Sequence, residues 1–310
     1  MTAICASASA TLTLITDINQ LPGSALGFYS LIVGGGSHTT QLSSDTTING
    51  NVALGSPISL EGGGAPINGE LDFAGSSNGT GSVDVSGGIT TNSAVAAAAA
   101  SDAESLFQQY SLLTGLPTLD SNTLNVANTP GASYNGNTNE HVYAITDWKF
   151  NGDLAITAGA DQYVIIDVLP GSKKNYSLGA VSLSGGITYD HVLFNIDTTG
   201  QLSSWNAHGG TVNAIILDGS FTSGGVSYGG KVNVGDFTLD GRLFCTTGSN
   251  DCQVASNATI DSTVDFGSSG VPEPISLLLT GSGLVLLAFA LRRFRTRCHQ
   301  VGTGTSICNV

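Results

Sequence analysis

The sequence contains little charge and few cysteines. Charged residues make up 10% of its 310 positions, against roughly 25% in ordinary soluble domains. Gly, by contrast, occupies 42 positions. A surface with so little charge has to be built from Ser, Thr, Asn and Gly, which is typical of extracellular β proteins and atypical of cytosolic enzymes. The five Cys exclude a densely disulfide-bonded scaffold.

Basic residues are scarce over most of the chain. Of the 23 acidic residues, 22 precede Val271, whereas four of the nine basic residues lie between positions 292 and 297. The long segment before Val271 is therefore strongly acidic and repels phosphate groups, which excludes nucleic acid as a partner. Its negative charge supports solubility and tolerates cations.

The two Gly-rich stretches that look like phosphate or oxyanion loops do not carry the residues that catalysis would need. Neither a P-loop Lys nor a Gly-x-Ser-x-Gly nucleophile elbow follows residues 34–38 or residues 208–211. Three carboxylates beside Gly leave calcium binding open, namely Asp218, Asp236 and Asp240, although no EF-hand or nonapeptide calcium pattern accompanies them. We therefore expect no enzyme, no catalytic residue, no metal centre and no required cofactor.

The C-terminal region has three parts in a fixed order. The motif Val271-Pro272-Glu273-Pro274 precedes an uncharged apolar run that begins at Ile275 and ends at Leu291. Four arginines follow, at Arg292, Arg293, Arg295 and Arg297. A helix over the apolar run would be about 26 Å long, enough for a thin hydrocarbon core. The sequence thus predicts one transmembrane helix whose basic end stays in the cytoplasm, with the residues before position 271 outside.

This order of parts resembles the PEP-CTERM sorting signal of exopolysaccharide-producing Gram-negative bacteria. The resemblance covers about 25 residues and implies that an exosortase, a membrane enzyme, processes the chain near Pro272 to Pro274. It also implies an inner-membrane intermediate and delivery to the cell surface or extracellular matrix. Members of this family usually end after the arginines, whereas this chain continues to Val310, so the status of residues 298–310 is uncertain.

The central region consists of short β-type runs separated by turn residues. Examples are residues 29–33, 163–168, 192–196 and 231–234. An apolar residue followed by a turn dipeptide recurs at steps of about 20 residues, at Ile48, Ile67 and Val85, and again at Leu217 and Leu239. Such steps favour the stacked rungs of a β-solenoid. A β-sandwich uses the same turn dipeptides and stays the alternative.

One segment departs from the β pattern. Residues 93–114 are Ala-rich and place apolar residues every three or four positions, at Val95, Ala99, Ala103, Leu106, Phe107, Tyr110 and Leu113. Ser93 provides an N-cap, and Gly115 with Pro117 ends the segment. The pattern predicts an amphipathic helix that packs its apolar stripe on the flank of the solenoid.

The order of these parts is similar to that of choice-of-anchor A domains and of ice-binding-like domains. The resemblance lies in the opening at residues 25–54, the later runs at 163–168 and 191–196, and the series from 210 to 241. It implies a right-handed β-helix with one helix alongside. Some choice-of-anchor A relatives are described as adhesins, and these domains occur on proteins with varied surface anchors, including the PEP-CTERM tag.

The expected organisation has four parts. Residues 1–19 are a signal-peptide remnant that lacks a basic start, residues 20–268 are the solenoid, residues 269–297 are the sorting segment, and residues 298–310 are the tail. Cys245 and Cys252 lie seven positions apart around a flexible loop and are a disulfide candidate in an exported protein.

The main prediction for function is an exported surface or matrix protein with an adhesive or structural role, with exopolysaccharide or a matrix protein as its partner. Ice binding is one alternative. It requires regularly spaced hydroxyls or small residues on a flat face, and no repeated Thr-x-Thr array occurs at rung spacing. A polysaccharide-degrading enzyme on a β-helix is the other alternative.

Overall fold

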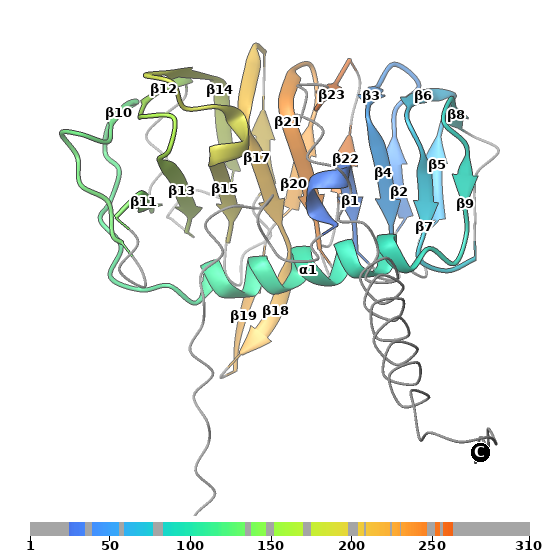
Figure 1. Cartoon of the computed structure of the whole chain (residues 1–310), viewed down its shortest axis with the longest axis horizontal. Helices are drawn as coiled ribbons and strands as arrows, with labels where there is room; N and C mark the ends of the chain where they lie inside the picture. Colours follow the sequence, from blue (N-terminus) through green and yellow to red (C-terminus); the bar gives the residue numbers. More distant parts are fainter. Residues whose placement is uncertain are drawn as a thin grey trace, which may run out of the picture. The chain divides into compact units, whose positions relative to one another are not determined.

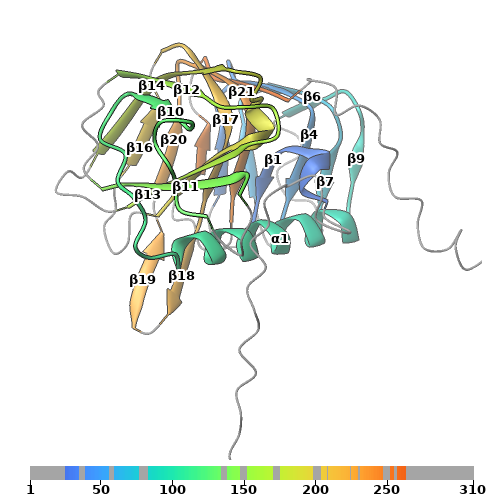
Figure 2. The same cartoon turned by 60° about the vertical axis from the view of Figure 1, so that its left-hand side comes forward.

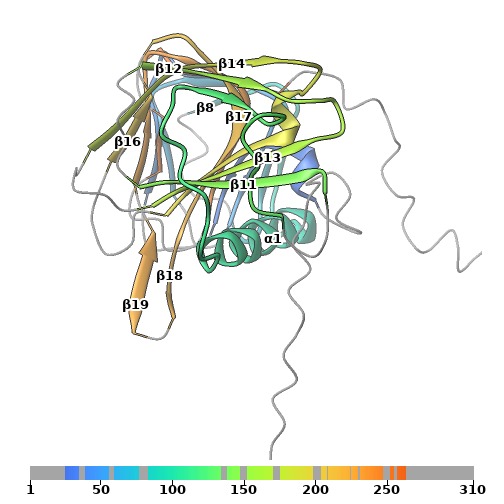
Figure 3. The same cartoon turned by 90° about the vertical axis from the view of Figure 1, so that its left-hand side faces the viewer.

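A computed structural model describes residues 25–262, except 35–38, 56–58, 77–82, 134–137, 147–151, 170–174, 198–203, 208, 224, 230, 247–251 and 255–256. In these residues 21 strands form a single sheet, and its strand pairs are parallel. A β-sandwich is built from antiparallel sheets, so the structure decides for the solenoid. The sheet winds around three faces, which are shown in Figure 1 and from one end in Figure 3.

The helix-side face of the solenoid is the one on which the long helix α1 (Ala94–Ser111) packs. Its nine strands are, in spatial order, β11 (Glu140–Ile145), β13 (Tyr163–Val168), β15 (Val192–Ile196), the second halves of β17 (Thr211–Asp218) and β21 (Thr238–Cys245), β1 (Tyr29–Val33), β4 (Asn51–Leu54), β7 (Leu71–Phe73) and β9 (Ile89–Thr90).

The second face, called the open face here, is formed by strands that alternate with those of the helix-side face along the chain. In spatial order they are β10 (Thr123–Asn125), β12 (Gly152–Thr157), the second half of β14 (Asn175–Ser184), the first halves of β17 and β21, β23 (Thr259–Asp261), β3 (Thr47–Asn49), β6 (Ala65–Asn68) and β8 (Val83–Val85).

The third face completes each rung. It contains the first half of β14, then β16 (Ser204–Ala207), β20 (Lys231–Val234), β22 (Cys252–Val254), β2 (Thr39–Leu42) and β5 (Ser59–Gly62). An antiparallel hairpin, β18 (Ser220–Ser223) and β19 (Val226–Gly229), projects from the body of the solenoid in Figure 2. Two short 3₁₀ helices, η1 (Leu26–Phe28) and η3 (Tyr189–His191), precede β1 and β15.

The rungs do not stack in the order of the chain. The N-terminal rungs lie at one end, and the long helix then leads to β10 and β11 at the opposite end (Figure 1). From there the chain winds back, so that β21 and β23 lie between β17 and the N-terminal strands β1 and β3. The last described strands, β21 to β23, therefore form a rung that stacks directly on the first rung of the protein, β1 to β3.

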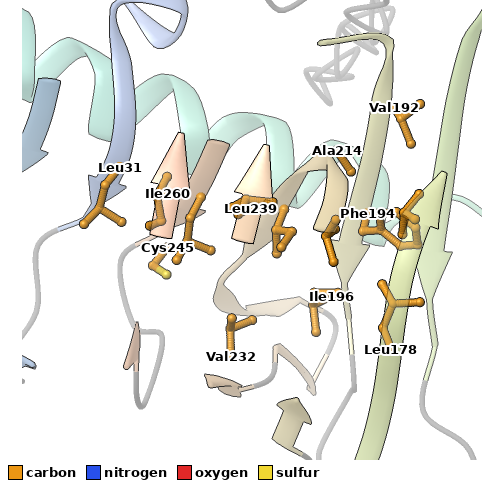
Figure 4. Packing of buried hydrophobic residues seen from close by; sticks show 14 of the residues in the cluster. Leu31, Leu178, Val192, Phe194, Ile196, Ala214, Val232, Leu239, Cys245 and Ile260 are labelled. Atoms are coloured by element: carbon orange, nitrogen blue, oxygen red, sulfur yellow. The ribbon is translucent and has the colours of Figure 1, made fainter. Parts of the chain in front are cut away.

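Two apolar clusters hold the solenoid together. The larger one fills the interior between the three faces, and Figure 4 shows part of it, with Leu31, Phe194, Leu239 and Ile260 among the labelled side chains. The smaller one lies between the helix-side face and the helix and includes Ile32, Ile165 and Phe244. Ile48, Ile67 and Val85 lie beside one another on neighbouring strands, which confirms the predicted rung spacing at these positions.

The predicted helix is α1 (Ala94–Ser111). Ser93 caps it as expected, because its hydroxyl accepts a 3.2 Å hydrogen bond from the backbone N–H of Ala96. The buried stripe differs by one position from the predicted one: Ala96 is buried and Val95 is 49% exposed. Val95 is the bulky residue of this first turn and was assigned to the stripe, and the alanines around it give no pattern that would correct the phase.

The predicted membrane segment, residues 275–291, lies outside the described residues, as do the predicted signal-peptide remnant and the tail. Within the described part, no helix combines the length and the hydropathy needed to cross a bilayer.

Candidate functional site

Four threonines form a row on the open face. Thr211 pairs with Thr238, Thr238 with Thr259, and Thr259 with Thr47, on four neighbouring parallel strands. The next residue in each strand points to the interior and is buried: Val212, Leu239, Ile260 and Ile48. Because side chains alternate between the two sides of a strand, all four threonines point outward. Thr211 is exposed and the other three are half-buried.

A second row of polar side chains runs beside the threonines, two residues further along each strand. In spatial order it contains Asn213, Asp240, Asp261, Asn49 and Asn68. Nδ2 of Asn68 donates to Oδ1 of Asn49 over 2.8 Å, and Nδ2 of Asn49 donates to Oδ2 of Asp261 over 3.2 Å. These hydrogen bonds join three strands through their side chains and restrict the rotamers of this row.

The two rows form an array with two regular spacings. Neighbouring strands lie about 4.7–4.9 Å apart, and outward residues two positions apart in a strand are separated by roughly 6.5 Å. Threonine is stiff because its β-carbon is branched. Each threonine also offers a methyl group beside its hydroxyl. The open face therefore presents hydroxyls and methyls at spacings that the backbone sets.

The electrostatic feature of this face is a pair of neighbouring carboxylates. Asp240 and Asp261 lie opposite each other on β21 and β23. Partial burial raises the pKa of Asp240, and the negative charge of Asp261 raises it further. Nδ2 of the other neighbour, Asn213, donates to the backbone carbonyl of Val181 over 2.7 Å. The charge of the pair is thus concentrated in the middle of the second row.

The open face continues beyond the threonine row with small polar residues. Thr157 and Ser184 share a 2.8 Å hydrogen bond between their hydroxyls. Ser182 and Thr123 lie on either side of Ala155 in the register. The most extensive contacts of α1 with the sheet are with strands of the helix-side face, β1, β4, β7, β15 and β17.

The structure does not bring the three candidate calcium ligands together. Asp218 lies at the buried end of β17 on the helix-side face, opposite Cys245, whereas Asp240 is on the open face. Asp236 accepts a 3.0 Å hydrogen bond from Asn257. In the part of the chain that the structure describes, no three His, Cys, Asp or Glu side chains are grouped to hold a metal ion.

Of the other predicted site residues, Cys245 is fully buried and disulfide-bonded. Its assignment to Cys252 stays a prediction. The sorting motif from Val271 to Pro274 and the arginines from Arg292 to Arg297 lie outside the described residues.

The threonine row was not predicted. The signal that the four threonines share is a tripeptide, Thr-x-Asn or Thr-x-Asp with an apolar middle residue, at Thr47, Thr211, Thr238 and Thr259. The sequence also contains this tripeptide at Thr118, Thr123 and Thr263, so it does not identify the row by itself. A search for Thr-x-Thr misses it. Chain order also hides it, because Thr47 belongs to the first rungs and Thr259 to the last strand.

No protein-family model and no curated protein matches the chain. Among solved structures, a glycosylated ice-binding protein from an Arctic yeast is 15% identical, with a TM-score of 0.48 over 84% of this chain and 96% of that chain. An ice-binding protein from an Antarctic biological consortium is 17% identical, with a TM-score of 0.46 over 80% of this chain and 91% of that chain. An ice-binding protein domain of Shewanella frigidimarina is 13% identical, with a TM-score of 0.38 over 76% of this chain and 94% of that chain.

At these identities and TM-scores the likenesses transfer no activity to this chain. They do bear on the main functional prediction, because all three proteins are named as ice-binding proteins. The predicted adhesive or structural matrix role is therefore wrong as the main interpretation, and the names agree with the alternative, ice binding. They also agree with the expectation that the chain is not an enzyme.

Proposed function

We propose that the protein binds ice through the open face. The observation that carries the proposal is the row formed by Thr211, Thr238, Thr259 and Thr47 on four consecutive strands. Ice is a regular lattice of water, so a protein surface that adsorbs to it needs groups that hold water at fixed and repeated positions. A row of stiff threonines on a hydrogen-bonded sheet meets this requirement.

The physical basis of binding is the sum of many weak contacts. Each hydroxyl can bond one or more ordered waters, and such bonds are nearly as favourable as direct ones. The methyl groups limit how these waters orient, and the rigid sheet removes most of the entropy cost of arranging the hydroxyls. Loss of one central threonine should therefore disturb the array well beyond a single contact.

The test is thermal hysteresis, together with the shape of single ice crystals, in the full-length protein and two variants. Thr238→Tyr places a bulky ring in the middle of the row and should remove most of the hysteresis and the crystal faceting. Thr222→Tyr is the matched control, since Thr222 is exposed on β18, away from the open face, and should leave both unchanged. Circular dichroism should show that both variants are folded. Wild-type protein that neither shifts the freezing point nor shapes crystals would refute the proposal.

We infer in addition that the protein is exported and sorted through its C-terminal region. The support is the order of Val271 to Pro274, the apolar run to Leu291 and the four arginines, together with the disulfide at Cys245, which requires an oxidising compartment. An exosortase and the membrane are the partners in this step. Mass spectrometry of the protein from its native host tests it, because a mature chain that retains the arginines would contradict processing near Pro274.

A further inference from the structure

The last turn of α1 rests on two buried carboxyl groups. Glu140, at the start of β11, and Asp167, in β13, are both 0% exposed. Glu140 lies close enough to Tyr110 of α1 to act on its phenol electrostatically. Asp167 is connected to Ser111 of α1 through Asn195, whose Nδ2 donates to the Asp167 carboxylate over 2.9 Å and to the Ser111 hydroxyl over 3.2 Å.

Glu140 has no hydrogen-bond donor for either of its carboxylate oxygens among the described residues. An ionised carboxylate that is buried without a donor or a cation is costly, and protonation removes most of that cost. Burial accordingly raises the pKa of Glu140 from 4.5 to about 7.

Asp167 also lacks a hydrogen-bond donor for one of its carboxylate oxygens, in a different geometry. Its Oδ1 accepts from Asn195, but its Oδ2 and the amide oxygen of Asn195 both lack a donor in the described residues. Two acceptors cannot bond each other. A proton on Oδ2 of Asp167 would remove the negative charge from the buried carboxyl group and turn an acceptor without a donor into a donor.

Among the described residues, no positive charge acts on these two acids. Asp197, which follows β15, adds a second negative charge beside Asp167, and burial and this charge together hold the pKa of Asp167 well above its usual range. The register partners on the paired strands are Ala144 for Asp167 and Tyr163 for Glu140, and neither is a basic residue. The C-terminal end of a helix carries a partial negative charge of its own.

We propose that the last turn of α1 is docked on the solenoid through two neutral carboxyl groups, Glu140 and Asp167, and that loss of their protons loosens this turn. The helix then acts as a cover whose attachment depends on pH. Loosening it uncovers apolar residues of the helix-side face that lie beneath α1, among them Val142, Ile165 and Leu193.

The sign of the pH dependence follows from the direction of the shifts. A carboxyl group whose pKa is raised by folding favours the folded state most when it is protonated, and that contribution is lost as the pH rises through the folded-state pKa. For Glu140 the loss falls between pH 4.5 and about pH 7. Asp167 follows the same sign, because its pKa is also raised by folding, and its contribution is lost as the pH rises through that raised pKa.

The test compares the full-length protein with the double variant Glu140→Gln and Asp167→Asn, in buffers with EDTA. Thermal unfolding and binding of a hydrophobic dye are measured from pH 5 to pH 9. The midpoint of the wild type should fall by at least about 3 °C over this range and its dye binding should rise. The double variant carries permanently neutral groups, so its midpoint should fall less and should exceed that of the wild type at pH 9. Asp120→Asn, at an exposed position, should behave like the wild type.

A wild-type midpoint that stays constant would overturn the proposal, as would a double variant with the same slope. The proposal would also be overturned if replacing EDTA with calcium chloride raised the thermal midpoint of the wild type at pH 8. A metal ion would then satisfy these carboxylate oxygens. If the double variant does not fold, the carboxyl carbons of the wild type are followed by NMR. If both carboxyl groups titrate with midpoints below pH 5 in this NMR experiment, the proposal is contradicted.

Discussion

Asn49 donates a 3.2 Å hydrogen bond from Nδ2 to Oδ2 of Asp261, although the two residues are 212 positions apart. The bond crosses the seam where β23 lies between β3 and β21. Ser30 and Ser262 share a second hydrogen bond at the same seam, and the backbone N–H of Ser262 donates to the carbonyl of Asn49. The last described strand is therefore held by side chains as well as by backbone, and it contributes Thr259 to the threonine row.

The first prediction concerns the strength of this seam. A double-mutant cycle of Asn49→Ala and Asp261→Ala should give a coupling free energy of about 0.5–1.5 kcal/mol, since the two residues are in direct contact. Urea unfolding of the four proteins measures it. The matched pair is Asn257 with Asp236, which are joined by an exposed 3.0 Å hydrogen bond of the same kind and should couple more weakly. Equal coupling free energies in both pairs would contradict the prediction, because the hydrogen bond at the seam would then be no stronger than an exposed one.

Local sequence patterns were sufficient for the elements of the fold. The predicted helix over residues 93–114 contains α1, and the runs at 29–33, 163–168 and 192–196 coincide with β1, β13 and β15. These predictions succeeded because each depends on a cap, a turn dipeptide or a periodicity within about 20 residues. The same holds for the register of Ile48 with Ile67.

Long-range register could not be predicted in this way. Leu217 and Leu239 lie on neighbouring strands, β17 and β21, as expected, but they are not register partners. Leu217 pairs with Phe244 on the helix-side face and Leu239 with Val212 on the open face. A turn dipeptide follows strands of more than one face, so its spacing does not identify the face. The threonine row could not be predicted for a related reason. The pairing of β23 with β3 joins the end of the described chain to its beginning, and no local pattern specifies it.

The second prediction concerns a corner of the solenoid where glycines stack. A Cβ atom on Gly69 would lie 2.4 Å from the carbonyl oxygen of Gly50, and one on Gly87 would lie 2.6 Å from the carbonyl carbon of Gly69. Gly69→Ala should therefore destabilise the protein by about 1–3 kcal/mol through overpacking. Gly152 has nothing within 4 Å of its Cβ position, so Gly152→Ala should be tolerated. Denaturant midpoints compare the two, and an unaffected Gly69→Ala variant would contradict the close stacking.

The third prediction concerns Arg242, which is 2% exposed. Its Nη1 donates to the backbone carbonyls of Leu26 and Tyr29, so β21 holds the start of the described chain in place. Burial lowers the pKa of Arg242 to about 10, which leaves it charged at neutral pH.

Arg242→Met should destabilise the protein by about 1–3 kcal/mol, because it removes the buried hydrogen bonds that the guanidinium group donates to the two carbonyls. Arg242→Lys should recover little of this loss, since an ammonium group lacks the planar fork of donors. Urea unfolding distinguishes the variants. A methionine variant as stable as the wild type would mean that removing a buried charge outweighs the lost hydrogen bonds.

The fourth prediction concerns the disulfide of Cys245. Cys245 ends β21 and Cys252 begins β22, so a bond between them would close the short connection from the helix-side face to the third face. Cleavage before Asp residues cuts the chain at Asp240, Asp251 and Asp261 and separates the two cysteines. The fragments 240–250 and 251–260 should therefore travel as one mass until a reductant is added. Cys252→Ser should lower the free energy of unfolding by about 2–3 kcal/mol, the value that loop entropy gives for so short a loop. A link from fragment 240–250 to Cys5, Cys298 or Cys308 would reject the pairing, and it would tie the solenoid to a terminal segment of the chain.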